Sequence, residues 1–590
     1  MKDISLVKLA SIPAVGIIAQ WIAIRIKLPS ILLLLLSGFL IGPVFNLLQP
    51  DELLGNMLFP FISLSVAIIL FEGGLSLRIS DLKQTGKAVT TLIFLGGLIS
   101  WVLISIFAHF FLKLDLRLSV LLGSILIVSG PTVVTPLLRQ IKLKHSLASI
   151  LRWEGIIIDP VGAALAVLVF EVIMAHTAAD AIGTGFIVLI STLLSGFVIG
   201  LIGALLLIII FKKNLLPDYL QEAFTFIMVL STYAIADIIQ SESGLLVVTI
   251  MGIVLANQKI VTIRHIVSFK ENITVLLISS LFVVLGARVE LSDLLQSLSI
   301  STVFFLISLI VFVRPVSVFL STINSSLTFL EKGFIASIYP RGIVAAAVAS
   351  LFSIRLSEAG VPNADLLNPI TFFTIILTVS FYGLLGRPLV RFLRLQRQQQ
   401  GIIFVGAHHW SRLFAKSLDI ANVPILMIDT NLENIISAKE MGLDTKHGSV
   451  LSRKIMDELE MSSYGKILSL TSSDETNLLA SIEYSQIFSK FNVIRLYPKD
   501  RKKDLFIKSE QGLFLLGKGM SSTYIQSLIT AGASFKPSTL TEEFNYSDFL
   551  EQYPKAYVLC MINAKGRLKF FYEGHSYKPV PGCIIIALRK

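Results

Sequence analysis

The chain is dominated by a series of apolar segments that fill its sequence as far as Leu393. There are about thirteen of them, each about 20 residues long, and a helix of that length crosses the hydrocarbon core of a bilayer. Hydrophobic residues make up 54% of the whole chain, which is more than a soluble protein of this size carries. We therefore expect a polytopic α-helical membrane protein. The segments begin near Ser5, Pro29, Leu53, Ala88, Arg117, Ser146, Ala181, Asp218, Ser243, Glu271, Ser299, Leu327 and Asn368.

Basic residues gather in the loops that follow the odd-numbered segments. Examples are Arg25, Arg78, Lys144, Lys213 and Arg264. Because positively charged loops stay in the cytoplasm, the N-terminus is expected outside and the part after the last segment inside. The same loops explain the net charge of +11, so no nucleic-acid partner is expected. The predicted location is the cytoplasmic (inner) membrane, with multiple passes.

The sixth segment, residues 146–175, carries two carboxylates, Glu154 and Asp159. Charges inside a membrane helix are costly and mark functional positions. Five residues apart on a helix, the two side chains point roughly 140° apart, so they face different neighbours. We expect one carboxylate to sit in a structural ion pair and the other to be free to trade a proton for a cation.

Two segments are interrupted by helix-breaking residues. The fifth contains V-S-G-P-T-V-V-T-P at Val128 to Pro136, and the twelfth contains Y-P-R-G at Tyr339 to Gly342. Proline and glycine break helices, and freed backbone groups at membrane depth survive only when buried in protein or facing a wet cavity. Two broken segments in corresponding halves predict an inverted-repeat transporter with a central site. The alternative, two simple proline kinks, leaves the charge of Arg341 unexplained.

Two further charges lie within the segments. Arg314, in the eleventh, needs an anionic partner at that depth, and Glu154 is the natural one because an Arg–carboxylate pair can be bidentate. Glu72 lies near the end of the third segment. It is either an interface residue or a second titrating group at the ion site.

Taken together, these residues resemble the sodium/proton antiporter branch of the monovalent cation/proton antiporter family. The resemblance covers the whole membrane half and rests on a set of motifs in this order and spacing. It implies a dimerisation domain and a six-helix core domain, in which the broken fifth and twelfth segments cross beside Asp159. Asp159 would then carry the ion or proton, and Glu154 and Arg314 would form the structural pair. The motifs are F-E-G-G-L at Phe71, G-P-T-V-V at Gly130, E-G-I-I-I-D-P at Glu154, V-R-P at Val313 and P-R-G at Pro340.

The chain departs from the family pattern at two positions near Asp159. Where the family commonly has Thr-Asp-Pro, this chain has Ser129-Gly130-Pro131, and where it commonly has Asn before the key Asp, this chain has Ile158. Both changes remove polar side chains. Backbone carbonyls of the broken fifth segment, with Ser129 or Thr132, would then replace the cation's hydration shell, and the cation is Na⁺, K⁺ or Li⁺. The predicted broken-helix crossing consists of Gly130, Pro131, Arg341 and Gly342.

The predicted function is secondary antiport, not enzyme catalysis. A proton and a monovalent cation, Na⁺ first, compete for one buried carboxylate, which gives one-for-one, electroneutral exchange unless a second group such as Glu72 also titrates. A K⁺ efflux system or a K⁺ channel-like protein gated by the soluble part is the alternative, but a channel filter such as T-V-G-Y-G does not occur in the sequence. A membrane sensor without transport would leave Asp159 without a purpose.

The remainder, from about Gln396, has the composition of a soluble domain. A strand at Gly401–Val405, a helix at His409–Asp419 and a strand at Val423–Ile428 open a dinucleotide-binding unit. Further strands are expected at Lys466–Leu470 and Asn492–Leu496. This part resembles the TrkA-N-like domain that regulates K⁺ conductance, and its strand-rich end resembles the second lobe of such domains. Since such domains assemble in pairs, a homodimer is expected. The predicted domains are 1–395 for transport, 396–535 for the Rossmann-like regulator and 536–590 for the small lobe.

The glycine fingerprint of the dinucleotide turn is damaged. Where G-x-G-x-x-G is expected, the chain has G-A-H-H-W-S, so that Gly406 is kept but His408 stands where the backbone should approach a pyrophosphate. Asp429 is the acidic residue expected after the second strand. We therefore predict that no cofactor is required, that NAD or another nucleotide is at most a weak ligand at Gly406 and Asp429, and that no metal is bound. The two cysteines, Cys560 and Cys583, are expected to be reduced and buried.

Overall fold

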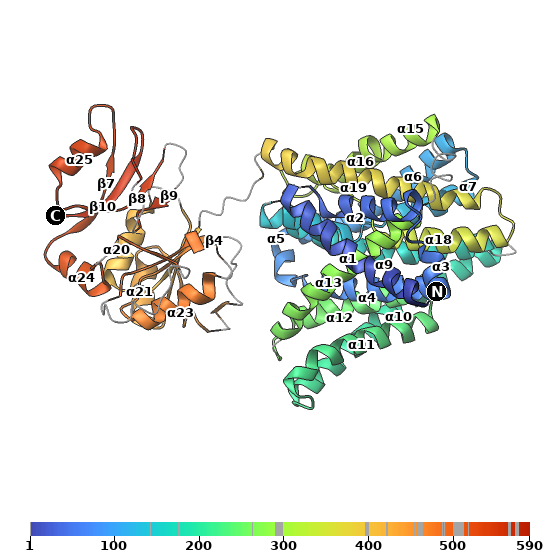
Figure 1. The fold of residues 1–590 in the computed structure, drawn as a ribbon, viewed down its shortest axis with the longest axis horizontal. Helices are drawn as coiled ribbons and strands as arrows, with labels where there is room; N and C mark the ends of the chain where they lie inside the picture. The colour runs from blue at the N-terminus through green and yellow to red at the C-terminus, as the bar shows by residue number, and fades with distance from the viewer. Residues whose placement is uncertain are drawn as a thin grey trace. The chain divides into compact units, whose positions relative to one another are not determined.

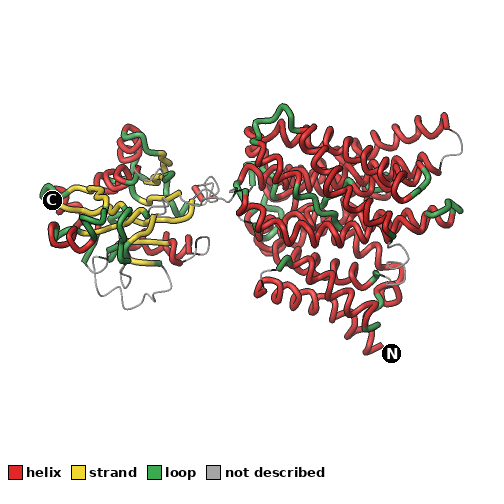
Figure 2. The backbone as a smooth tube through the Cα atoms, turned by 90° about the horizontal axis from the view of Figure 1, so that it is seen from above, coloured by secondary structure: helices red, strands yellow, loops and turns green. Residues whose placement is uncertain are grey.

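A computed structural model separates the chain into two compact units, residues 1–397 and 398–590. Figure 1 shows both units, and Figure 2 shows that the strands described all belong to the second. The sequence also predicts a basic, glutamine-rich linker from Arg391 to Gln400, of which residues 394 and 396–400 lie outside the described part. The residues described are 2–590 without 27, 142, 175–177, 262, 290–298, 394, 396–400, 420–422, 453–454, 457–463, 486–487, 489, 499–511, 517–518, 564–567 and 573–576.

The first unit is a bundle of apolar helices. Within the described residues, nine helical segments are long and apolar enough to cross a membrane, and three shorter apolar helices accompany them. The predicted α-helical membrane class is therefore confirmed, whereas the number thirteen stays a prediction. The helices are α1 (Lys2–Ile26), α2 (Ser30–Phe39), α3 (Pro50–Leu54), α4 (Leu58–Leu75), α5 (Leu82–Thr91), α6 (Gly97–Leu112), α7 (Leu116–Leu126), α8 (Pro131–Gln140), α9 (His145–Met174), α10 (Ala178–Lys212), α11 (Asp218–Ile239), α12 (Ser243–Asn257), α13 (Arg264–Ala287), α15 (Ile300–Ser308), α16 (Arg314–Ser321), α17 (Phe329–Ala336), α18 (Ile343–Glu358) and α19 (Leu367–Phe392).

Small residues allow close contacts between helices of this unit. A Cβ added at Gly74 of α4 would lie 2.6 Å from the carbonyl oxygen of Thr249 in α12. Gly252 of α12 faces the backbone of α4 in return, and helix packing in membranes relies on such small residues. Through these glycines α12 packs along α4, and α10 and α11 lie beside it (Figure 1).

The second unit has two sheets. Six parallel strands lie in the order β3-β2-β1-β4-β5-β6, the order of a dinucleotide-binding fold, which confirms the predicted Rossmann-like class. The second sheet is antiparallel, β7-β10-β8-β9. The elements of the second unit are β1 (Gly401–Val405), α20 (His409–Ser417), β2 (Ile425–Asp429), α21 (Leu432–Glu440), β3 (Asp444–His447), β4 (Tyr464–Ser469), α23 (Asp474–Ser485), β5 (Val493–Arg495), β6 (Leu513–Phe514), α24 (Ser522–Thr530), β7 (Ser534–Thr539), α25 (Tyr546–Gln552), β8 (Tyr557–Ile562), β9 (Leu568–Phe570) and β10 (Ile584–Arg589).

One hydrophobic core joins the two sheets. The Phe414 ring of α20 lies 5.1 Å from that of Phe535 in β7 and 6.5 Å from that of Phe570 in β9. The antiparallel lobe therefore packs on the Rossmann-like sheet through α20. The sequence did not predict β3 and β6, because β3 is a partly exposed edge strand without apolar alternation and β6 has only two residues.

Candidate functional site

Two helices of the membrane unit are broken where the sequence predicted it. Chain without helical structure, residues 127–130, separates α7 from α8, and residues 337–342 separate α17 from α18. Pro131 begins α8, where its missing N–H costs nothing. Gly130 and Gly342, the residues before α8 and α18, both have extended backbone.

The two breaks touch each other. A Cβ added at Gly342 would lie 3.1 Å from the backbone nitrogen of Gly130 and 3.2 Å from Oγ1 of Thr132. Such distances leave little room for a side chain larger than hydrogen at Gly342. Both predicted breaks therefore meet at one point, where the N-termini of α8 and α18 come together.

Asp159 of α9 faces this meeting point. Its side chain is fully buried, and a Cβ added at Gly130 would lie 2.5 Å from its Oδ2. Neither carboxylate oxygen has a hydrogen-bond partner among the described residues. Because an unpaired buried carboxylate is very costly, this group needs a proton or a cation.

The other predicted ligands lie in the first break, on α8 and on α4. Thr132 is buried, and its Oγ1 has no hydrogen-bond partner in the described part of the chain. Ser129 is also buried, and its carbonyl oxygen would lie 3.0 Å from a Cβ added at Gly155 of α9. Glu72 is buried on α4, next to Gly73, which packs against Pro131 and Ile156. Its role as a ligand stays a prediction.

The structure pairs Glu154 with Arg314. Arg314 donates from Nη1 to Oε1 at 2.5 Å and from Nη2 to Oε2 at 2.9 Å, and both side chains are buried. Arg314 also donates to the carbonyl oxygens of Ile335 and Ile338, the latter in the second break. It begins α16 directly after a π-helical turn, Leu309–Val313, a feature common at functional sites.

Tyr339 lies in the second break, and no role for it is predicted from the sequence. Its hydroxyl donates to the carbonyl oxygen of Ile127 in the first break at 2.6 Å, and its ring contacts the guanidinium groups of both Arg314 and Arg341. Arg341 is buried, and its Nε and Nη1 have no hydrogen-bond partner within the described residues. Only the neighbouring Pro340 signals the position, because it forces an extended backbone on the residue before it.

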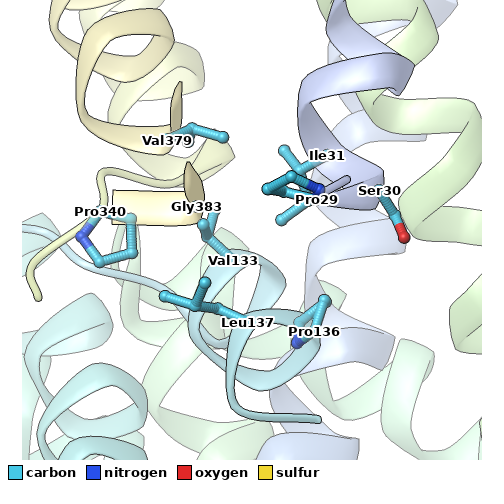
Figure 3. Close-up of a pocket in the computed structure, with 9 residues that line it drawn as sticks. All are labelled: Pro29, Ser30, Ile31, Val133, Pro136, Leu137, Pro340, Val379 and Gly383. Atoms are coloured by element: carbon cyan, nitrogen blue, oxygen red, sulfur yellow. The ribbon is translucent and has the colours of Figure 1, made fainter. Parts of the chain in front are cut away.

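A small, mostly apolar pocket lies beside the crossing (Figure 3). It is formed by the start of α2, one face of α8, Pro340 of the second break and one face of α19. Val133 adjoins the ligand candidate Thr132, so the pocket is close to the site. Its lining residues are Pro29, Ser30, Ile31, Val133, Pro136, Leu137, Pro340, Val379 and Gly383.

The predicted nucleotide turn of the second unit is filled by its own side chains. Gly406 has a positive φ of 100°, as the turn requires, but a Cβ there would lie 3.3 Å from Thr471. Oδ2 of Asp429 accepts hydrogen bonds from the Ala407 N–H and the Asn434 amide. The turn and the Asp429 carboxylate are therefore engaged by groups of the chain itself in this conformation, which disfavours tight dinucleotide binding.

His408 closes the same turn. Its Nε2 lies 2.6 Å from the carbonyl oxygen of Leu470. Burial lowers the pKa of His408, so the neutral ring donates from Nε2 to that carbonyl. The side chain that replaces the second glycine thus binds the turn after β1 to the end of β4.

Comparison with known proteins agrees with this architecture. A family model described as "Sodium/hydrogen exchanger, transmembrane" matches residues 12–392, which contain every buried charge discussed for the first unit. The chain belongs to this family. A second model, the TrkA-N domain, matches residues 402–510.

Individual relatives differ in the cation that their names give. Na(+)/H(+) antiporter 1 of Methanocaldococcus jannaschii is 29% identical over 366 residues, 59% of this chain and 82% of that protein. K(+)/H(+) antiporter NhaP of Alkalimonas amylolytica is 27% identical over 394 residues, 65% of each. The solved structure of the sodium proton antiporter MjNhaP1 from M. jannaschii at pH 8 matches with a TM-score of 0.58 and 26% identity, covering 66% of this chain and 98% of that one.

Proposed function

We propose that this protein is a secondary antiporter that exchanges a monovalent cation, Na⁺ first, for protons at Asp159. The observation that carries the proposal is the burial of Asp159 at the meeting of two broken helices, with no hydrogen-bond partner for either oxygen among the described residues. Intramembrane carboxylates of this kind mark ion and proton pathways. Membership in the sodium/hydrogen exchanger family supports the same function.

Exchange follows from competition for one group. A proton neutralises the Asp159 carboxylate, and a bound cation favours its ionised form. The site therefore carries either a proton or a cation. The N-terminus of α8 begins at the same place, and its partial positive charge stabilises the ionised carboxylate between the two states. Access from each side in turn, as in other inverted-repeat transporters, completes the cycle.

The oxygen ligands proposed for the cation are few. Asp159 supplies the charge, and Thr132 supplies a hydroxyl without another partner in the described residues. Ser129 and the backbone carbonyls of residues 127–130 would supply the rest. Gly130 and Ile158 contribute no polar side chain, so cation selectivity depends on main-chain oxygens, and Na⁺, K⁺ and Li⁺ must each be tested.

The second unit is proposed to regulate transport. It has the strand order of a dinucleotide-binding fold and matches the TrkA-N domain. The basic loops of the membrane unit support a cytoplasmic location for it, and pairing of such domains supports a homodimer. A regulatory ligand can shift the equilibrium between two conformations of the transporter only by the difference in its affinity for those conformations. The turn at Gly406 and Asp429 is the place where NAD or another nucleotide would bind weakly.

The proposal is tested with purified protein in proteoliposomes that contain a pH dye. Na⁺, K⁺ and Li⁺ gradients are applied in turn, with the membrane potential clamped by an ionophore for an ion that is not under test. We expect cation-driven proton flux for the parent and none for folded Asp159→Asn. Full flux in that variant would remove Asp159 from its role. K⁺ movement without proton movement would instead identify a channel-like protein.

A further inference from the structure

Tyr339 connects the two broken helices. It lies in the second break, with 4% of its surface exposed, and its hydroxyl donates at 2.6 Å to the carbonyl oxygen of Ile127. Ile127 directly follows α7, so its carbonyl is one of the groups that the first break leaves without a helical partner. Pro340 keeps Tyr339 in the extended conformation from which the side chain reaches the other break.

The Tyr339 ring also holds two positive charges. The guanidinium carbon of Arg314 lies 4.0 Å from the ring centroid, and that of Arg341 lies 3.9 Å from it. The two guanidinium carbons are therefore at most about 8 Å apart. Both distances are in the range of a cation–π contact, which is strongest for desolvated groups.

The two arginines differ in their other partners. Arg314 is neutralised by Glu154 through two hydrogen bonds. Arg341 has no carboxylate partner in the described residues, and two of its nitrogens are left without a hydrogen bond there. Its backbone N–H donates to Oγ1 of Thr378, which fixes the main chain but not the charge. Tyr339 is the residue that positions the Arg341 guanidinium, through its ring and a side-chain hydrogen bond.

The position of that charge matters for Asp159. Arg341 immediately precedes Gly342, which touches Gly130, and Gly130 lies against the Asp159 carboxylate. A guanidinium in this crossing attracts the ionised carboxylate and repels a cation bound to it. A small movement of Arg341 toward Asp159 therefore weakens cation binding.

We infer that Tyr339 is a positioning residue that sets the cation affinity of the Asp159 site. Its ring keeps the Arg341 guanidinium away from the carboxylate, and its hydroxyl fixes the register of the two breaks. Without the ring, Arg341 turns toward Asp159, whose buried carboxylate has no hydrogen-bond partner in the described part of the unit. The inference rests on the proposed antiport and names a determinant of its cation affinity.

Two substitutions separate the ring from the hydroxyl. Tyr339→Leu removes both, and Tyr339→Phe keeps the ring. We expect the cation KM of Tyr339→Leu to rise about tenfold, the scale of a desolvated cation–π contact, with kcat within about threefold of the parent. Tyr339→Phe should return KM to within about threefold of the parent. Tyr233→Phe is the matched control, because Tyr233 is a buried tyrosine of α11 that packs against Gly244 of α12 instead of the crossing.

The measurement is initial proton flux against cation concentration in proteoliposomes, after size-exclusion chromatography has confirmed folded protein. Equal KM values for the parent and Tyr339→Leu would overturn the inference, as would a fall in kcat alone or equal effects of Leu and Phe. Cation-dependent thermal stabilisation, measured in NaCl or KCl against choline chloride, gives the apparent affinity without transport. A parent that binds cations without flux would contradict the proposed antiport, while a weaker affinity in Tyr339→Leu would still support the role of Tyr339. Equal cation-dependent stabilisation of the parent and Tyr339→Leu, or no stabilisation of either protein, would overturn the inference about Tyr339.

Discussion

Breaking the Glu154–Arg314 pair tests whether one of the two carboxylates of α9 is purely structural. The pair is buried, with 3% and 2% of the two residues exposed, and its two hydrogen bonds measure 2.5 and 2.9 Å. The perturbations are Arg314→Met, Glu154→Gln and both together. Each replacement keeps the approximate length of the side chain and removes its charge.

The structure predicts unequal costs for the two single changes. Arg314→Met leaves the Glu154 carboxylate buried with no cation, which costs about 3–5 kcal/mol. Glu154→Gln leaves Arg314 with its contacts to the Ile335 and Ile338 carbonyls and to the ring of Tyr339. The guanidinium still lacks an anion, so this change also costs about 3–5 kcal/mol, toward the lower end because those contacts remain. The double variant should recover about 2 kcal/mol or more relative to the sum of the single ones, because no uncompensated charge remains.

The assay is reversible unfolding of purified protein in detergent, followed by intrinsic fluorescence and analysed as a double-mutant cycle. Arg288→Met is the matched control. Arg288 also pairs with a carboxylate, Asp51, at 3.0 Å, but 59% of the Asp51 side chain is exposed, so its loss should cost less than about 1 kcal/mol. If Arg314→Met is as stable as Arg288→Met, or if the two single effects simply add, Glu154 and Arg314 do not stabilise each other and this reasoning is wrong.

Three further predictions concern the site and the second unit. Gly130→Ala puts a Cβ 2.5 Å from Oδ2 of Asp159 and should lower cation-driven proton flux about 100-fold. Gly333→Ala is the control, because a Cβ there has no atom within 4 Å, and its flux in the same assay should equal that of the parent. A chain that ends at Arg397 should still exchange ions with an altered response to pH or ligand, and a folded truncation without flux would contradict a regulatory role for the remainder. Calorimetry with the full chain should give a Kd for NADH above about 1 mM and a lower Kd after His408→Gly. A micromolar Kd for the parent would show that the turn opens.

Much of the membrane site could be predicted because intramembrane charges are so costly. Arg314 needed an acid at its depth, Glu154 was available, and the structure brings them together. Similarly, the glycines and prolines of the two breaks determine where each helix must stop. Tyr339 escaped prediction because tyrosine is unremarkable in an apolar segment. Its hydroxyl bonds to Ile127, which is more than 200 positions away in the chain, and no local pattern encodes such a contact.

The second unit illustrates a different limit. The missing glycine at His408 predicted an impaired turn, but the sequence did not indicate what fills it. The bond from His408 to Leu470 and the contact of Thr471 with Gly406 depend on how β1 and β4 lie in the sheet. Tertiary contacts of this kind follow from the strand order and the register, which the sequence alone did not specify.

If Asp159 is the exchange site, as proposed, the balance of buried charge favours exchange of one monovalent cation for one proton. Among the described residues of the membrane unit, the buried charged side chains are three carboxylates, Glu72, Glu154 and Asp159, and two guanidinium groups, Arg314 and Arg341. If all five are ionised, the interior carries one net negative charge. A single proton or a single monovalent cation at Asp159 removes it, and both loaded states then have the same net charge. Because a buried net charge is expensive, the empty ionised state is the one that the bilayer penalises most. Exchange is thereby favoured over uncoupled return of the empty transporter, so long as Glu72 keeps its charge throughout the cycle.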